Sequence, residues 1–231
     1  MRNAMPDLVQ VRVGKSQQIS SSCSVGGGTN DFHHPSGPWR SAIFKAPVEG
    51  PVRLGSFGLL GDEVADRRHH GGPDQAVLAY ASEHYPQWQA MGLGADIGSF
   101  GENFLLAGLT DREACIGDVF AIGESGQVVV QVSHPRQPCA TLARRFQRND
   151  VVPMVWETAR GGWYLRVLQE GLVQAGDGLR LKERPNPDWN IARVLNAFYH
   201  AKLNPREALA AANIPGLTGR WASSLREKAG A

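Results

Sequence analysis

Short runs in which apolar and polar residues alternate, separated by glycines and prolines, fill the first four-fifths of the sequence. Residues 8–13, 52–54 and 163–168 alternate in this way, and 128–133 is an almost continuous β-type run. A period of two residues predicts strands that bury one face. The 27 glycines and 14 prolines exceed average usage, which indicates many turns between short strands. The sequence therefore predicts a mainly β (α+β) domain.

Helical periodicity is confined to short pieces in this part of the chain. Residues 82–91 form one candidate, which Pro86 limits to a turn or two at its start. Residues 141–148 form another, with two large apolar side chains four positions apart. Residues 15–40 are rich in serine, glycine and proline and show little periodicity, so we expect a long loop there.

The pattern changes at the Arg-Pro-Asn-Pro sequence of residues 184–187. Beyond it, apolar spacing predicts three helices, over residues 191–198, 205–212 and 218–229. Three short helices bury little surface alone, so we expect them to dock on the main domain or on a partner. The predicted organisation is a β-barrel-like domain over residues 1–183 and a small helical bundle over 184–231.

Size and composition exclude several classes of protein. The chain of 231 residues has no apolar stretch near eighteen residues and no secretory signal. We therefore expect no membrane span. A net charge of +2 gives no general case for nucleic-acid binding. Three cysteines without framework spacing favour a reducing, cytoplasmic setting.

Cys139 is the strongest candidate for a reactive residue. It lies in a proline-rich turn after the apolar run, and a basic, helix-like segment follows it at once. Arg136, Arg144, Arg145 and the positive end of a helix would all lower the pKa of its thiol. A thiolate formed in this way is a nucleophile or a soft-metal ligand. The alternative is a small buried residue at the end of a strand.

Two other segments suggest contacts to an anion. The bare backbone of Gly71 and Gly72, after His70, would let a ligand approach closely while amides point at an anion. Arg67 and Arg68, just before, would then pair with phosphate. A plain turn and two solvated arginines are the alternative interpretation.

Polar residues in two further segments complete the set of candidates. Glu102 and Asn103 offer a carboxylate and an amide suited to the hydrogen-bonding edge of a heterocycle, or they form a capped turn. Ser133 lies just before Arg136 and Cys139.

The histidines do not predict a zinc site. They occur as adjacent pairs at 33–34 and 69–70, and neighbours in sequence do not readily chelate one ion together. The sequence also lacks the nucleophile elbow of α/β hydrolases and the glycine-rich fingerprints of Rossmann and P-loop proteins.

Taken in order, these segments resemble the MOSC domain, named for the C-terminus of molybdenum cofactor sulfurase. The resemblance rests on the segments 61–66, 70–80, 100–103, 117–118 and 133–139. It covers roughly residues 8–182 and is strongest to the stand-alone bacterial YiiM-like branch, whose three-helix extension the tail resembles.

The resemblance implies a barrel-like fold that binds the molybdenum–pterin cofactor, with Cys139 as the molybdenum ligand and catalytic residue. It implies reduction of N-hydroxylated compounds, such as hydroxylaminopurines, to amines, with electrons from a separate flavoprotein; pyridoxal phosphate is not expected. Charge and order alone suggest arginines for the pterin phosphate. The candidate cofactor-binding residues are Arg67, Arg68, His70, Gly71, Gly72, Glu102, Asn103, Ser133 and Arg136.

Two alternatives to a reductase remain. Cys139 could carry a persulfide and hand its sulfur to a partner, or the protein could bind the cofactor for delivery without turnover. Metal content distinguishes the sulfur carrier from the reductase. An activity assay distinguishes the delivery protein, which would bind molybdenum but not reduce a hydroxylamine. The expected partner is a small-molecule substrate, and the expected oligomeric state is a monomer or homodimer.

Overall fold

The computed structural model describes residues 5–20, 38–68 and 70–230, and one large sheet organises this part of the chain. Its strands are β1 (Asp7–Val13), β4 (Ala46–Pro47), β7 (Val77–Ala81), β8 (Phe104–Ala107), β9 (Val119–Ile122), β10 (Val128–Pro135), β11 (Trp163–Gln169) and β13 (Leu179–Glu183). Their order across the sheet is β13-β9-β10-β11-β7-β8-β1-β4. Neighbours are antiparallel except β7 and β8, which run parallel.

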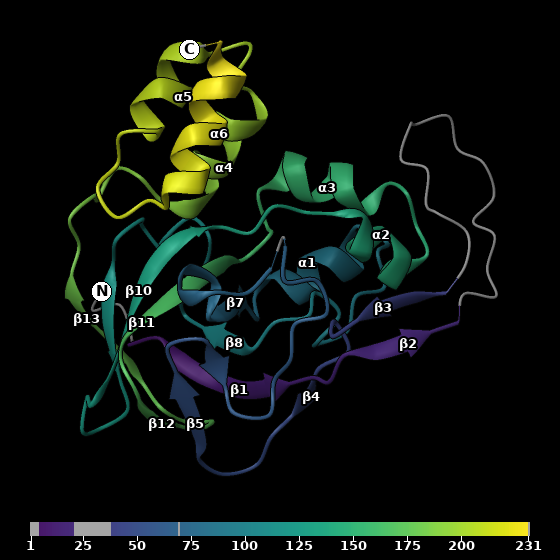
Figure 1. Cartoon of the computed structure of the whole chain (residues 1–231), viewed down its shortest axis with the longest axis vertical. Coiled ribbons are helices and arrows are strands. Elements are labelled where there is room, and N and C mark those ends of the chain that lie inside the picture. The colour runs from purple at the N-terminus through teal and green to yellow at the C-terminus, as the bar shows by residue number, and fades with distance from the viewer. Residues whose placement is uncertain (1–4, 21–37, 69, 231) are drawn as a thin grey trace.

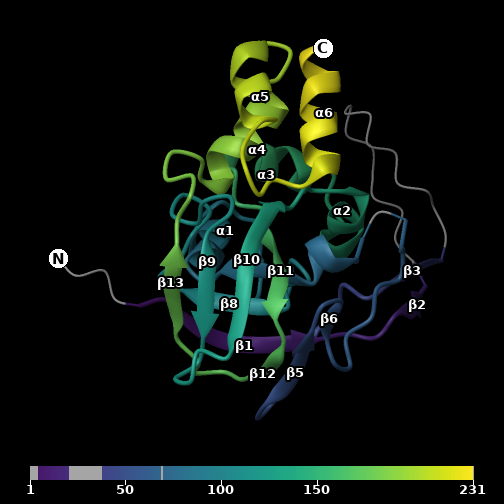
Figure 2. The same ribbon diagram turned by 60° about the vertical axis from the view of Figure 1, so that its left-hand side comes forward.

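The sheet curls until its two sides meet. Leu8 of β1 donates its backbone N–H to the carbonyl of Asp177 at 2.9 Å, and Leu179 of β13 donates to Pro6 at 2.7 Å. These bonds connect β1 to the start of β13, which is the opposite edge strand. Figure 2 shows β13, β9, β10 and β11 in front of β8 and β1. The predicted mainly β, barrel-like fold is confirmed.

Two smaller sheets lie beside the large one. Strands β5 (Val52–Gly55), β6 (Gly58–Leu59) and β12 (Gly171–Val173) form the first, and β2 (Gln17–Ile19) and β3 (Trp39–Ser41) form the second. The loop predicted over residues 15–40 is therefore wrong at both ends. Three-residue strands are too short to produce a readable period, and their pairing depends on segments that are distant in sequence. The centre of that predicted loop, with Cys23, lies outside the described residues.

A β-bulge changes the buried face of β1. The register against β8 shifts between Leu8 and Gln10. As a result Leu8 and Val11 are fully buried while Val9 is 42% exposed. A simple alternation through residues 8–13 would have placed Val9 and Val11 on the same face.

The helices agree well with the expected pattern. They are α1 (His84–Ala90), α2 (Ala140–Phe146), α3 (Val151–Thr158), α4 (Ile191–Tyr199), α5 (Pro205–Ala211) and α6 (Gly219–Ala229), with a 3₁₀ turn, η1, at Pro73–Gln75. The side chain of Asn204 caps α5, and that of Thr218 caps α6. Helix α3 was not predicted, because its Val-Val-Pro-Met-Val start has strand-like composition. No helix in the described part of the chain is long and apolar enough to cross a bilayer.

The three C-terminal helices pack against the end of the large sheet, as Figure 1 shows. Trp221 of α6 stacks on His134 of β10, with ring centroids 5.8 Å apart, and contacts Phe198 of α4 at 4.9 Å. One hydrophobic core runs without a break from Leu8 of β1 to Leu225 of α6. Docking on the main domain is therefore observed, while a domain boundary between residues 183 and 184 stays a prediction.

A buried carboxylate fixes the segment that leads into these helices. Asp118 is fully buried and accepts hydrogen bonds from Arg184 at 2.7 and 2.9 Å and from the backbone N–H of Cys115 at 2.9 Å. We expect Asp118→Ala to lower the free energy of unfolding by about 2 kcal/mol, because it leaves a partly exposed guanidinium and a buried amide without their acceptor. Urea denaturation measures this loss. The exposed Glu183→Ala is the control, and equal stability of the two variants would contradict the expectation.

Candidate functional site

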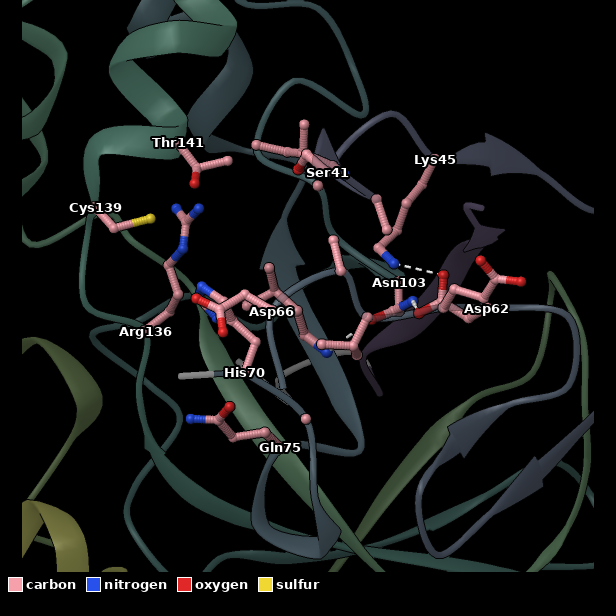
Figure 3. A pocket seen from close by; sticks show the side chains of 18 of the residues that line it. Ser41, Lys45, Asp62, Asp66, His70, Gln75, Asn103, Arg136, Cys139 and Thr141 are labelled. Carbon is pink, nitrogen blue, oxygen red and sulfur yellow. Dashed lines mark hydrogen bonds and ion pairs between the residues drawn. The ribbon is translucent and has the colours of Figure 1, made fainter. Parts of the chain in front are cut away.

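The turn after β10 and the loop before η1 line a cavity of about 250 Å³. Its wall is completed by the β3–β4 segment and by the residues before β8. Figure 3 shows Cys139, Arg136 and Thr141 at one end of this cavity and Lys45 with Asp62 at the other. Segments far apart in the sequence therefore form one site, which we call the thiol cavity.

The two prolines of its turn fix the position of Cys139. Prolines at 135 and 138 prevent both β10 and α2 from continuing through this turn. Cys139 itself is extended, with φ −134° and ψ 172°, and it is the residue immediately before α2. Its side chain is half-buried, so the thiol lines the cavity and remains open to small molecules.

The thiol of Cys139 is acidic. Burial raises its pKa, but a hydrogen bond from His70, the charge of Arg136 and two hydrogen bonds from Thr141 outweigh burial and lower the pKa to about 6. Cys115, the other described cysteine, has a raised pKa because of burial and the nearby charge of Asp118. At neutral pH Cys139 is therefore mainly a thiolate, the form that attacks electrophiles and binds metals.

This difference predicts the pH dependence of alkylation. In metal-free protein, we expect the rate at Cys139 to rise through about pH 6 and to level off above it, because the reactive thiolate is then fully formed. Thr141→Val removes a hydroxyl donor and should move the midpoint to higher pH. Mass spectrometry of the alkylated peptides measures each cysteine separately, with Cys115 as the internal control. A midpoint near that of an ordinary thiol in the wild type would contradict the assignment.

Arg136 places a buried positive charge beside the thiol. Its side chain is only 5% exposed, and its backbone N–H donates to Gly162 at 2.9 Å. One terminal nitrogen, Nη2, lies 3.5 Å from the carbonyl of Phe100, while Nη1 has no partner in the described structure. A buried guanidinium without a carboxylate is costly. The arrangement is suited to an anion that supplies the missing acceptor.

A second buried charge lies at the far end of the cavity. Lys45 forms an ion pair with Asp62, and their side chains are 8% and 11% exposed. Burial lowers the pKa of Lys45, and Asp62 partly offsets this. Asp62 also accepts from Gly14 N–H at 2.7 Å and from Asn103 Nδ2 at 2.9 Å. The pair gives this end a polar wall that is fixed by three distant parts of the chain.

Glycine is required at one tight point of the wall. Gly101 has φ +74°, and a Cβ there would lie 2.7 Å from Ile43 Cγ1. The β3–β4 segment can therefore approach this close only because residue 101 has no side chain.

The structure brings some of the predicted site residues together and separates others. Five of them line the thiol cavity: His70, Gly71, Asn103, Arg136 and Cys139. The side chain of Asn103 is already used within the protein, because its Oδ1 accepts from Leu78 N–H and its Nδ2 donates to Arg12 and Asp62. It therefore orders the wall.

The remaining candidates lie elsewhere. Ser133 is fully buried, with its Oγ 2.6 Å from the carbonyl of Asp74, and it lines no described cavity. Glu102 is also fully buried and accepts from Tyr85 and from Gly98 N–H. Both side chains therefore form hydrogen bonds within the protein and do not line either cavity. Arg67, Arg68 and Gly72 line a second, neighbouring cavity.

Sequence reasoning missed several cavity residues. Lys45, Gln75 and Thr141 line the thiol cavity and were not selected. A single lysine, glutamine or threonine carries no spacing signal. Only Thr141 could have been found, since it comes two residues after Cys139 on the first turn of a predicted helix.

The sequence is similar to a family model and to several known proteins. A family model, "MOSC domain", matches residues 66–180. The chain is 38% identical to YflK of Bacillus subtilis and 33% identical to YiiM of Escherichia coli, with 81% of this chain and 84% of each relative covered. It is also 40% identical to a protein of Gibberella moniliformis named "Reductase" over 68% of this chain, which is 29% of that longer protein.

Crystal structures of YiiM proteins have a similar fold. The crystal structure of YiiM from Geobacillus stearothermophilus superposes with a TM-score of 0.75 at 32% identity, covering 97% of this chain and 99% of that one. YiiM from Escherichia coli gives a TM-score of 0.73 at 26% identity, covering 98% and 93%. The fold and these relatives together define the class of protein: the chain belongs to the MOSC domain family. Within that family it is a YiiM-like protein.

Proposed function

We propose that this protein is an oxidoreductase that binds the molybdenum cofactor and reduces N-hydroxylated compounds, such as hydroxylaminopurines, to amines. Its family is associated with this cofactor, and a relative at 40% identity is named a reductase. The observation that carries the proposal is the acidic thiol of Cys139 beside the unpaired buried guanidinium of Arg136 in one cavity.

The residues of the thiol cavity fit this group. The Cys139 thiolate is the kind of soft ligand that molybdenum with sulfur ligands prefers. The unpartnered Nη1 of Arg136 would donate to an anionic group of the cofactor beside Cys139, and Arg40, which also lines the cavity, could pair with the anionic phosphate of the pterin. When bound, the cofactor supplies two-electron redox chemistry that no side chain can supply.

The protein's own contribution is to position the substrate and deliver protons. Reduction breaks the N–O bond, consumes two electrons and two protons, and releases the oxygen as water. Burial lowers the pKa of His134 to about 4, so this residue is neutral at pH 7 and is a poor proton donor. His70 lines the cavity and contacts the thiol, and we assign proton delivery to it. A separate flavoprotein as electron donor belongs to the same proposal.

Metal content and turnover test the proposal together. The protein should be purified under reducing conditions from a host that makes the cofactor. We expect close to one molybdenum and one pterin per chain, and formation of adenine from 6-hydroxylaminopurine with a chemical electron donor. Folded protein with neither molybdenum nor pterin would overturn the proposal. Bound molybdenum without turnover would favour a protein that only delivers the cofactor.

A sulfur carrier is the second candidate. A half-buried thiol with a pKa near 6 also suits formation of a persulfide. Mass spectrometry of intact protein distinguishes the two functions. A persulfide on Cys139 adds the mass of one sulfur atom in protein that lacks molybdenum.

A further inference from the structure

A second cavity, of about 190 Å³, lies against the thiol cavity. We call it the arginine cavity, and its lining residues include Arg67, Arg68, His134, Thr218 and Arg220. His70, Gly71 and Gln75 line both cavities, so this short stretch is their common wall. A ligand that crosses the wall could occupy both cavities at once.

The arginine cavity carries excess positive charge. Arg67, Arg68 and Arg220 are exposed, and none of them forms an ion pair within the described part of the chain. The one carboxylate among the described lining residues is Asp74, whose Oδ1 already lies 2.8 Å from Arg166 Nε. Three guanidinium groups therefore face a small concave space without a matching anion. Guanidinium groups in such a space suit phosphate, which they can bind through paired hydrogen bonds.

The inner surface of this cavity is polar and fixed in place. His134 is buried and neutral, and its Nε2 lies 3.4 Å from Gln75 Nε2. The Oε1 atom of Gln75 is buried without a hydrogen-bond partner in the described structure. Because Trp221 stacks on His134, the first turn of α6 is held over the cavity with Arg220 at its edge. The C-terminal helices therefore supply part of this site.

The thiol cavity does not need these arginines for its own anion. Arg136 already places a buried cation without a carboxylate inside it, and Arg40 and Arg144 also line it. His70, which separates the cavities, is hydrogen-bonded to Cys139. The wall shared by the two cavities therefore carries a residue that contacts the reactive thiol.

We propose that the arginine cavity binds the phosphate of a nucleotide substrate, so that the N-hydroxylated base is reduced as a nucleotide in preference to the free base. This inference rests on the proposed function. The base would lie near Cys139, the ribose would cross the wall at Gly71 and Gln75, and the phosphate would contact Arg67, Arg68 and Arg220.

Binding by the full-length protein, purified with its cofactor, tests the inference. Isothermal titration calorimetry should compare adenosine 5′-monophosphate, adenosine and inorganic phosphate. We expect the nucleotide to bind at least about tenfold more tightly than either fragment, because charge-assisted contacts to phosphate add to those of the base. Arg220→Gln should weaken nucleotide binding by about tenfold, and the double variant Arg67→Gln, Arg68→Gln by more, with adenosine unaffected.

Arg206→Gln is the matched control, because Arg206 is an exposed arginine of the same helical extension that lines neither cavity. All the substituted arginines are exposed, so melting temperatures should stay unchanged and binding can be compared directly. Equal affinity for nucleotide and nucleoside, or equal loss in Arg206→Gln, would overturn the inference. Phosphate binding as tight as nucleotide binding would also overturn it.

Failure of this inference can be distinguished from failure of the proposed function. Molybdenum and turnover of the free base, together with unchanged nucleotide binding in the variants, would overturn only the nucleotide inference. Loss of nucleotide binding in the arginine variants of a protein without molybdenum would overturn the reductase and leave the phosphate site supported. In active protein, the ratio of kcat/KM for the hydroxylaminopurine nucleotide to that for the free base should fall by the same factor as the affinity.

Discussion

Replacing Cys139 with serine is expected to remove molybdenum from the protein and to lower the reduction of 6-hydroxylaminopurine by at least a hundredfold. A serine hydroxyl is not ionised at neutral pH and is a hard ligand, whereas the Cys139 thiolate is already formed at that pH. Elemental analysis of molybdenum per folded chain gives the primary result. Pterin, measured separately, shows whether the organic part of the cofactor is retained without its protein ligand.

Cys115→Ser is the matched control for this experiment. Cys115 is buried at 3% exposure and lies outside the thiol cavity, so its replacement tests general effects of losing a thiol. We expect it to retain molybdenum and activity. A Cys139→Ser protein with the wild-type amount of molybdenum would contradict the assignment of Cys139 as the metal ligand.

Replacing Arg136 with methionine is expected to change cofactor binding and stability in opposite directions. Methionine fills a similar volume but removes the buried guanidinium, whose Nη1 has no partner. We expect cofactor occupancy to fall by about tenfold or more, because an anion loses its charged donor. We also expect the metal-free variant to gain about 1 kcal/mol of stability, since a buried unpaired charge is removed.

Two measurements check this prediction. Molybdenum and pterin content report on the cofactor, and urea denaturation of metal-free protein reports on the free energy of unfolding. Arg148→Met is the control, because Arg148 pairs with Asp150 at the surface and should leave cofactor content unchanged. A metal-free Arg136→Met protein that is much less stable than the wild type would show that Arg136 is a structural cation.

The same two residues show how far sequence reasoning reached within the site. The order of segments selected Cys139 and Arg136, and the structure places both at one end of the thiol cavity. Arg67 and Arg68 were selected for the same phosphate and instead line the arginine cavity. The charges of these arginines were readable from the sequence. The sequence did not show on which side of the His70–Gln75 wall each arginine lies. That position depends on packing against β10 and α6.

The sequence by itself determined the features that depend on near neighbours. Alternation identified β5 and β11, and an almost continuous apolar run identified β10. A period near 3.6 identified α4 to α6, and prolines marked the turn that carries Cys139. Each of these depends on residues within about one helical turn or strand.

Only the tertiary structure decided which polar residues line a cavity and which are buried next to it. Ser133 and Glu102 are polar residues beside a site, yet contacts with Asp74, Tyr85 and Gly98 bury them completely. The pair of Lys45 and Asp62 joins the segment before β4 to the turn after β6, and no local pattern predicts it. The free energy of such contacts comes from burial and pairing between distant segments, and it exists only once the sheet has curled.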